Sequence, residues 1–453
     1  MSDFEFLFNP RSIAVVGASP EPNRPGAQTV RALQERGFDG GVYPVNPKYP
    51  ELAGLRCYAS IKDVPTPCDI AVIALPADLV PDMVAECGRH GVRFVVVFGG
   101  GFREAGPEGQ DRERRMLNAA RAHGVRIIGP NCLGLVNVHA NAYAAFGSLA
   151  RPPVLTPGPV SAVIQSGGFG NSLVVRCAAA GIGFRQVVAS GSESDLTAPE
   201  LVEAMIDDPG TRLILMYMEG ISDGRRFVAA AQRALAAGKP IVVWKAGNTR
   251  QGVKAAASHT ANMTGSYDIY RAAFRQCGVV EAQEMEEAID SIQCLLAYAD
   301  RPAGDDVAIM GGSGGSAVVF SDAADQCRLS LSVLAPATHA ALQKLLPNTA
   351  SLENPIDYAA GFITNANAPR FRAAVDAVLA DPAVHQLGVL FATTTGEHAR
   401  NGAEALVEAV QKHRKPIFTF LSVPRETTGG AMDALEAAGI PILPSPTRVA
   451  KAM

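Results

Sequence analysis

His259 is the residue in this sequence whose type and surroundings raise the clearest chemical question. It lies in the segment KAAASHTANMTG, from Lys254 to Gly265, which contains no carboxylate and no cysteine. An imidazole becomes a good nucleophile when a partner, often a carboxylate, fixes its tautomer. An isolated histidine is more often structural or simply exposed. The residues alone therefore leave both interpretations open.

Glu219 is the carboxylate that could orient this imidazole. It ends the largely apolar run LILMYMEG, and Lys245 ends the next such run, VVWKAG, shortly before His259. In a doubly wound sheet, ligands bind beyond the carboxyl ends of the strands. Glu219 and His259 are therefore expected to point at one crevice. The alternative for Glu219 is a helix cap at the surface.

Two glycine-rich segments could bind an anion such as a phosphoryl group. IQSGGFGNS places Ser166, Gly167 and Gly168 between an apolar run and a helical stretch, and MGGSGGSAVV repeats the arrangement from Gly311 to Ser316. A helix N-terminus offers free backbone N–H groups and the positive end of the helix dipole. Neither segment is a Walker motif, because no GK[ST] follows. Phosphoryl oxygens of a phosphorylated His259 could be held by both helix starts.

Loops near the N-terminus suit a phosphorylated nucleotide. GASPEPNRPG, from Gly17 to Gly26, is not the GxGxxG fingerprint of dinucleotide-binding proteins. The second predicted strand ends in Asn46-Pro47-Lys48, and a lysine there suits a phosphate better than a free ribose diol. Coenzyme A, with its 3′-phosphate, is a good candidate. Later strands end in ALPAD, FGGGF and GPNCLG, whose glycines permit close approach of a ligand; ordinary tight turns are the alternative for any one loop.

Alternating strands and helices must position all of these loops. Nearly continuous Val/Ile runs separated by Ala/Leu/Arg-rich stretches predict parallel sheets covered by helices on both faces. Proline-rich LARPPVLTPGP and the segment RPAGDD divide the chain into three blocks. We predict an α/β protein with a Rossmann-like CoA-binding domain at 1–148. Two flavodoxin-like doubly wound domains follow, at 149–302 with the histidine loop and at 303–453.

Composition excludes several other classes of protein. The 453 residues carry a net charge of −4, and no cluster of Lys and Arg suggests nucleic acid. The eight cysteines form no CxxC pair, so neither a metal site nor a disulfide framework is indicated. No apolar run approaches the length of a membrane span, and the first residues do not resemble a signal peptide. A soluble, cytoplasmic protein is expected.

At this point the motifs indicate a family. The chain resembles the α subunit of NDP-forming acyl-CoA synthetases, which are ADP-forming acetate–CoA ligases related to succinyl-CoA synthetase. The resemblance covers essentially the whole chain and is most specific around AAASHT and AAFRQCGVV; it also includes GAS, NPK, GPNCLG, QSGGFG, NPIDY and GIPILPSP. It implies the reaction acyl-CoA + ADP + phosphate ⇌ carboxylate + ATP + CoA, through an acyl phosphate and a phosphohistidine at His259 that Glu219 supports.

The resemblance also implies roles for the loop residues. Phosphate would be held by Ser166, Gly167, Gly168, Gly312, Ser313 and Gly314, and CoA by Gly17, Ser19, Lys48, Pro76, Gly100 and Asn131. Asn171 would approach the acyl group. The chain departs from the family pattern at Ala261, where glycine is usual, in GGSGG, where GGGPG is common, and at Gly191–Asp195, where GSESD replaces GNK.D.

The ATP-grasp module of this family, which supplies the nucleotide site, is not found in the sequence. The resemblance therefore implies an ATP-grasp β subunit as partner, in an α2β2-type assembly, with ADP or ATP and magnesium bound there. The small carboxylic acid and its CoA thioester would be the other ligands. One alternative is a CoA- or acyl-CoA-binding regulator that has lost catalysis with the module. Another is a Rossmann dehydrogenase, against which the missing GxGxxG and Lys48 both count.

Overall fold

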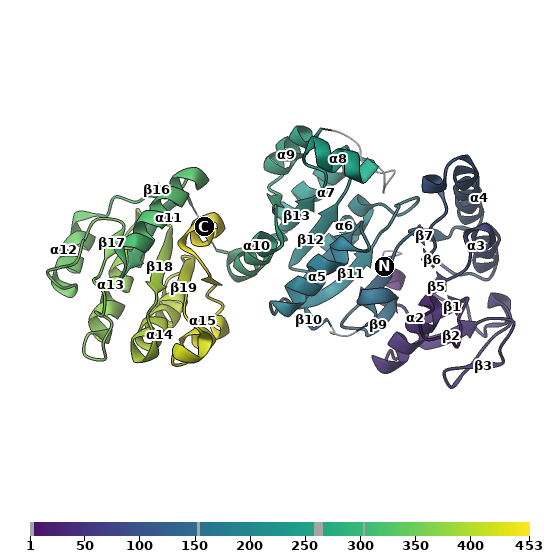
Figure 1. The fold of residues 1–453 in the computed structure, drawn as a ribbon, viewed down its shortest axis with the longest axis horizontal. Helices are drawn as coiled ribbons and strands as arrows, with labels where there is room; N and C mark the ends of the chain where they lie inside the picture. Colours follow the sequence, from purple (N-terminus) through teal and green to yellow (C-terminus); the bar gives the residue numbers. More distant parts are fainter. Residues whose placement is uncertain (1–3, 152–154, 258–265, 302–303) are drawn as a thin grey trace. The chain divides into compact units, whose positions relative to one another are not determined.

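The computed structural model describes residues 4–151, 155–257, 266–301 and 304–453, without the side chains of 255–257. The chain forms two compact units, Met1–Ile292 and Gln293–Met453. Each consists of parallel strands flanked by helices, which confirms the predicted α/β class (Figure 1). Among the described residues, no helix combines the length and apolar character that crossing a bilayer would require.

The first sheet of the N-terminal unit has five parallel strands in the order β2-β1-β5-β6-β7. Their bounds are Ser12–Val16 for β1, Gly41–Val45 for β2, Ile70–Ile73 for β5, Phe94–Val97 for β6 and Arg126–Ile128 for β7. Every residue of β5 and β6 is buried, as continuous Val/Ile runs predict. Because β1 lies between β2 and β5, the loops after β1 and β5 flank the topological switch point, where such sheets bind ligands.

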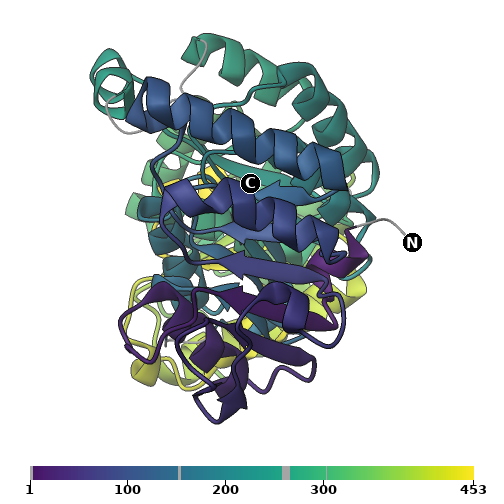
Figure 2. The same cartoon turned by 90° about the vertical axis from the view of Figure 1, so that its right-hand side faces the viewer.

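Helices cover both faces of this sheet. In Figure 2, α3 and α4 run side by side across one face, and their buried residues share a core with the strands. Long α4 begins with a proline in its first turn and ends at Gly124 in the left-handed conformation, both of which are common helix boundaries. The helices of this part of the chain are α1 (Glu5–Phe8), α2 (Pro25–Glu35), α3 (Val80–Arg89) and α4 (Pro107–His123). Its smaller elements are β3 (Glu51–Leu52), β4 (Leu55–Arg56) and 3₁₀ turns at 61–63, 77–79, 103–105 and 147–149.

The second sheet of this unit has seven strands in the order β14-β13-β12-β10-β11-β8-β9. Its parallel strands are β10 (Pro157–Ile164), β11 (Phe184–Ala189), β12 (Leu213–Met218), β13 (Ile241–Lys245) and β14 (Val280–Glu281). If these five strands are numbered 1 to 5 along the chain, their order across the sheet, starting from β11, is 2-1-3-4-5. This is the strand order of the flavodoxin-like fold, which we predicted for this part of the chain. The helices are α5 (Phe169–Ala179), α6 (Ala198–Asp207), α7 (Gly224–Ala236), α8 (Arg250–Ala257), α9 (Tyr267–Gln276) and α10 (Met285–Tyr298).

A hairpin extends this second sheet at one edge. Strands β8 (Gly134–Asn137) and β9 (Ala142–Ala145) pair with each other, and β8 runs antiparallel to β11. The predicted 1–148 domain would include this hairpin, yet the hairpin forms its hydrogen bonds with the second sheet. The first two predicted domains therefore share one compact unit, and their exact boundaries stay a prediction.

The C-terminal unit repeats the flavodoxin-like order in one sheet, β16-β15-β18-β19-β20, with short β17 paired to β15. Its strands are β15 (Asp306–Gly311), β16 (Ser330–Leu331), β17 (Ile356–Asp357), β18 (Gln386–Ala392), β19 (Ile417–Leu421) and β20 (Ile442–Leu443). Its helices are α11 (Gly314–Cys327), α12 (Pro336–Leu345), α13 (Ala368–Ala380), α14 (Gly396–Lys412), α15 (Ala431–Ala437) and α16 (Pro446–Ala452), with a 3₁₀ turn at 425–427.

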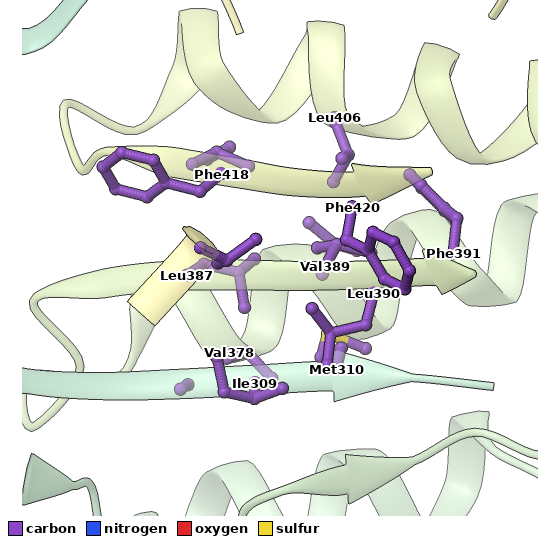
Figure 3. Close-up of a cluster of buried hydrophobic side chains, with 14 of the residues drawn as sticks. Ile309, Met310, Val378, Leu387, Val389, Leu390, Phe391, Leu406, Phe418 and Phe420 are labelled. Carbon is purple, nitrogen blue, oxygen red and sulfur yellow. The ribbon is translucent and has the colours of Figure 1, made fainter. Parts of the chain in front are cut away.

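Central strands and α14 form the core of this unit (Figure 3). Leu406 of α14 is completely buried there, so Leu406→Ala should leave a cavity and lower the free energy of unfolding by about 2–5 kcal/mol. Denaturant unfolding of the variant measures this loss. Val333→Ala serves as the control because Val333 is 87% exposed, and it should change the stability by less than about 0.5 kcal/mol.

Candidate active site

Two of the predicted loops meet at the switch point of the second sheet. Ser166, Gly167 and Gly168 follow β10, and Glu219 follows β12, the strand beside β10. The chain between these strands passes through β11 on the opposite side of β10. The structure therefore brings together the predicted helix start and the predicted carboxylate, although 50 residues of chain separate them.

Gln165 joins these two loops through its side chain. Its Oε1 accepts hydrogen bonds from the backbone N–H of Glu219 at 2.6 Å and of Gly220 at 3.1 Å. Its Nε2 donates to the carbonyl of Gly220 at 2.8 Å and to Oε1 of Glu193 at 2.9 Å. Gln165 is 5% exposed, so the four bonds are largely shielded from solvent, and they fix the position of the Glu219 backbone.

A buried cation lies beneath the same loop. Lys245, at the end of β13, donates from Nζ to the carbonyl of Glu219 at 2.8 Å and to that of Ala246, and it sits 4.7 Å from the ring centroid of Tyr270. Burial lowers the pKa of Lys245, while the charge of Glu219 opposes this shift. Burial, with the charge of Glu219 second, raises the pKa of Tyr217 to about 12. The Glu219 carboxylate therefore acts electrostatically on both sides of its loop.

The predicted nucleophile, His259, lies outside the described residues. Along the chain it comes between α8 and α9, after β13, which is the neighbour of β12 in the sheet. Its role and its approach to Glu219 stay a prediction.

Asn171, predicted to approach the acyl group, lies in the first turn of α5. It is 1% exposed, and its Nδ2 donates to Oγ of Ser148. Its Oδ1 makes no hydrogen bond among the residues that the structure describes. The side chain thus carries one acceptor without a partner close to the Ser166–Gly168 loop, and its role stays a prediction.

The second predicted phosphate loop lies at the equivalent place in the C-terminal unit. Gly311 ends β15, and Ser313 caps α11 by accepting from the N–H of Ser316 at 3.5 Å. A Cβ at Gly312 would lie 2.9 Å from the Tyr358 ring, so only glycine allows this approach. A cavity of about 460 Å³ opens here. Its lining includes Gly312, Ser313, Ser316, Tyr358, Thr394 and His398.

The predicted CoA-binding residues gather at the carboxyl edge of the first sheet. Gly17 has a positive φ of 85°, and a Cβ there would lie 2.5 Å from the Ala74 carbonyl, so this close approach of the two loops requires glycine. Ser19 caps the next turn, its Oγ accepting from the N–H of Glu21 at 3.1 Å. Pro76 precedes the 3₁₀ turn at 77–79. These loops leave the two strands at the switch point.

The remaining members of the CoA set lie on the flanking loops. Asn46 donates from Nδ2 to the Ala18 carbonyl at 2.7 Å, and its Oδ1 accepts from the N–H of Lys48 at 3.0 Å. Exposed Lys48 is therefore anchored by its backbone while its ammonium group faces solvent. On the other side, the N–H of Asn131 donates to the Gly99 carbonyl at 3.0 Å and brings Asn131 beside the loop of Gly100. Glycine-lined loops and an exposed lysine fit a phosphorylated nucleotide.

Sequence reasoning assigned no role to Gln165, Glu193 or Lys245, although it noted that Lys245 ends a strand and that Glu193 lies in a segment departing from the family pattern. The sequence did indicate Gln165 as a candidate, since it directly precedes Ser166 at a strand end. Among the described residues, no group of three or more His, Cys, Asp and Glu side chains could hold a metal ion.

Comparison with protein-family models defines the class of this chain. A CoA binding domain matches residues 11–138, a succinyl-CoA ligase like flavodoxin domain 157–295, and a ligase-CoA domain 307–441. The fold and its loops are thus those of a CoA ligase of the succinyl-CoA ligase type.

Individual relatives narrow this class. The chain is 37% identical to the ADP-forming acetate–CoA ligase I subunit alpha of Pyrococcus furiosus, and the match covers 99% of this chain and 96% of that protein. It is also 37% identical to the ADP-forming acetate–CoA ligase I of Archaeoglobus fulgidus, of which it spans only 62%. The chain belongs to the family of ADP-forming acetate–CoA ligases.

A solved structure agrees with this membership. The dinucleotide forming acetyl-coenzyme A synthetase 1 of Ca. Korarchaeum cryptofilum, in complex with phosphate and ADP, superposes with a TM-score of 0.88 at 35% identity. The match covers 100% of this chain and 96% of that chain.

Proposed function

We propose that this chain is the α subunit of an ADP-forming acyl-CoA synthetase that interconverts acyl-CoA + ADP + phosphate with carboxylate + ATP + CoA. The observation that carries the proposal is the meeting of the Ser166–Gly168 helix start and Glu219 at one switch point, held together by Gln165. Relatives named ADP-forming acetate–CoA ligases, and a structural neighbour solved with phosphate and ADP, support it.

The reaction divides into one acyl transfer followed by in-line phosphoryl transfers. Phosphate attacks the thioester carbonyl, the CoA thiolate leaves, and an acyl phosphate forms. A nitrogen of His259 then attacks phosphorus, the bond from phosphorus to the acyl oxygen breaks, and the carboxylate leaves. Glu219 would orient the imidazole, and the helix start at Ser166–Gly168 would neutralise the phosphoryl oxygens. The helix start at Gly312–Gly314 is a second phosphate-binding candidate, within the C-terminal unit.

A partner would complete the cycle. Phospho-His259 would deliver its phosphoryl group to ADP, which an ATP-grasp β subunit would hold with magnesium in an α2β2-type assembly. The P. furiosus relatives are named as alpha subunits, which supports a separate partner. The alternative of an inactive CoA-binding regulator is not favoured, because the chain matches 96% of the length of two proteins named as alpha subunits of ADP-forming acetate–CoA ligases.

The decisive experiment follows a phosphoryl group onto this chain. Incubation of the complex with acetyl-CoA and radiolabelled phosphate should give an acid-labile, base-stable label on this subunit, and addition of ADP should convert the label to ATP. A folded complex that binds CoA but takes up no label would favour the regulator instead.

Lys48 allows a separate test of the CoA site. Lys48→Ala should weaken binding of CoA about tenfold by calorimetry, because an ammonium group would no longer face the 3′-phosphate. Binding of 3′-dephospho-CoA should stay within twofold of the wild type. The control is Lys62→Ala, which removes another lysine of the same domain, from the 3₁₀ turn at 61–63. Equal losses for both ligands would contradict the role of Lys48.

A further inference from the structure

We propose that Glu193 is a positioning residue of the phosphate site, acting through Gln165 on the loops at Ser166 and Glu219. This inference rests on the proposed function and adds to it a residue outside those loops. It concerns the segment Gly191–Asp195, which follows β11, the strand that pairs with β10 on the side away from β12.

Gln165 is the link between Glu193 and the site. A glutamine side chain can adopt two amide orientations, and only one presents Oε1 to the N–H groups of Glu219 and Gly220. Two acceptors face Nε2 in that orientation, the Gly220 carbonyl and Oε1 of Glu193. A carboxylate accepts and cannot donate, so Glu193 favours the orientation in which Gln165 holds the Glu219 backbone.

Glu193 is itself held by three hydrogen-bond donors, to all of which its carboxyl group acts as the acceptor. Oε1 also accepts from Oγ of Ser190 at 2.7 Å, and Oε2 accepts from the N–H of Ala198 at 3.1 Å. Its backbone has a positive φ of 52°, an uncommon conformation for a residue other than glycine. Burial raises the pKa of Glu193, against the effect of its three hydrogen bonds and of Arg103. Such a costly arrangement is consistent with a functional constraint.

The segment around Glu193 is fixed to the first sheet. The N–H groups of Ser192 and Ser194 donate to the carbonyls of Pro130 and Gly129, at 2.9 and 3.1 Å. Asp195 accepts from the N–H of Ile127 at 2.7 Å. Glu193 therefore reaches Gln165 from a rigid base that lies on the CoA-binding side of the unit.

This acid also distinguishes the chain from the GNK.D pattern, in which a lysine stands at the position of Glu193. An ammonium group has three donors and no acceptor, so it could not accept from Gln165, Ser190 and Ala198. A lysine at this position would therefore break the network.

Glu193→Gln tests the inference in the complete enzyme. An amide offers one oxygen in place of two, so at least one of the three donors loses its acceptor and Gln165 can turn. We expect the KM for phosphate to rise about tenfold or more, with a lower kcat, while the KM values for acetyl-CoA and ADP stay within twofold. Glu193→Asp retains the charge at a shorter reach and should show a smaller rise.

Glu200→Gln is the matched control. Its carboxylate lies in the first turn of α6 and accepts from the N–H of Thr197 and from Arg126, and none of the contacts described for it joins it to Gln165. It should lower the melting temperature and leave the KM for phosphate unchanged. An unchanged KM in Glu193→Gln, or the same rise in Glu200→Gln, would overturn the inference.

Calorimetric binding of inorganic phosphate separates the inference from the proposed function. If the wild type forms no ATP but binds phosphate with an affinity that falls in Glu193→Gln, the function fails and the inference stands. If the wild type forms ATP and both proteins bind phosphate equally, the function stands and the inference fails. No phosphate binding by the wild type overturns the inference. Should Glu193→Gln not fold, Glu193→Asp gives the same comparison.

Discussion

Replacing His259 by asparagine should abolish phosphoryl transfer to this chain and lower the rate of ATP formation by at least about 10⁴-fold. An asparagine amide is of similar size and can form hydrogen bonds, but it cannot take up a phosphoryl group under these conditions. When a nucleophile is removed, only the catalysis that comes from binding and positioning remains. The measurement is acid-labile label after incubation with acetyl-CoA and radiolabelled phosphate, together with the steady-state rate.

Two other histidines make this prediction specific. His139 is exposed and bonds only the carbonyl of Gly158 among the contacts described for its ring, so His139→Asn should label as the wild type does. His398 lines the cavity beside Gly312 and Ser313, where a phosphoryl group could also be held. If His398→Asn loses the label and His259→Asn keeps it, then the nucleophile has been assigned to the wrong residue.

The parallel strands and the loops at their carboxyl ends could be predicted from the sequence, because both follow from local patterns. Continuous Val/Ile runs such as IAVI and FVVV identify buried parallel strands, and parallel strands place their following loops at one edge. That reasoning placed Ser166 and Glu219 at the ends of strands, and the structure brings those two ends together at the switch point.

Side-chain partners could not be predicted in the same way. Gln165 bonds residues 28 and 55 positions away, and nothing in its local sequence indicates which amide or carboxylate it meets. The β8–β9 hairpin shows a related limit. Its residues follow the first sheet directly, but strand pairing depends on which edge is open, and β11 offered one. Local pattern predicts an element, whereas its partner depends on the tertiary fold.

Replacing Glu219 by glutamine should lower the rate of label transfer about 10²-fold while leaving CoA binding unchanged. The carboxylate would hold one imidazole nitrogen and stabilise the positive charge that develops as the other attacks phosphorus. A neutral amide of the same shape cannot supply that charge. Single-turnover labelling with acetyl-CoA and phosphate measures the step directly, because later transfer to ADP does not contribute.

The hydrogen bonds that hold the Glu219 backbone should survive this substitution. The N–H of Glu219 donates to Gln165 and its carbonyl accepts from Lys245, so both of these contacts belong to the backbone and survive the change. Loss of the carboxylate charge should also lower the pKa of Tyr217 from its value of about 12, which a spectroscopic titration can follow. Suppose that the Tyr217 pKa falls in the variant while labelling stays within threefold of the wild type. The Glu219 carboxylate of the wild type would then be charged but would not act on His259. A fall in both would tie the catalytic effect to the loss of the carboxylate charge.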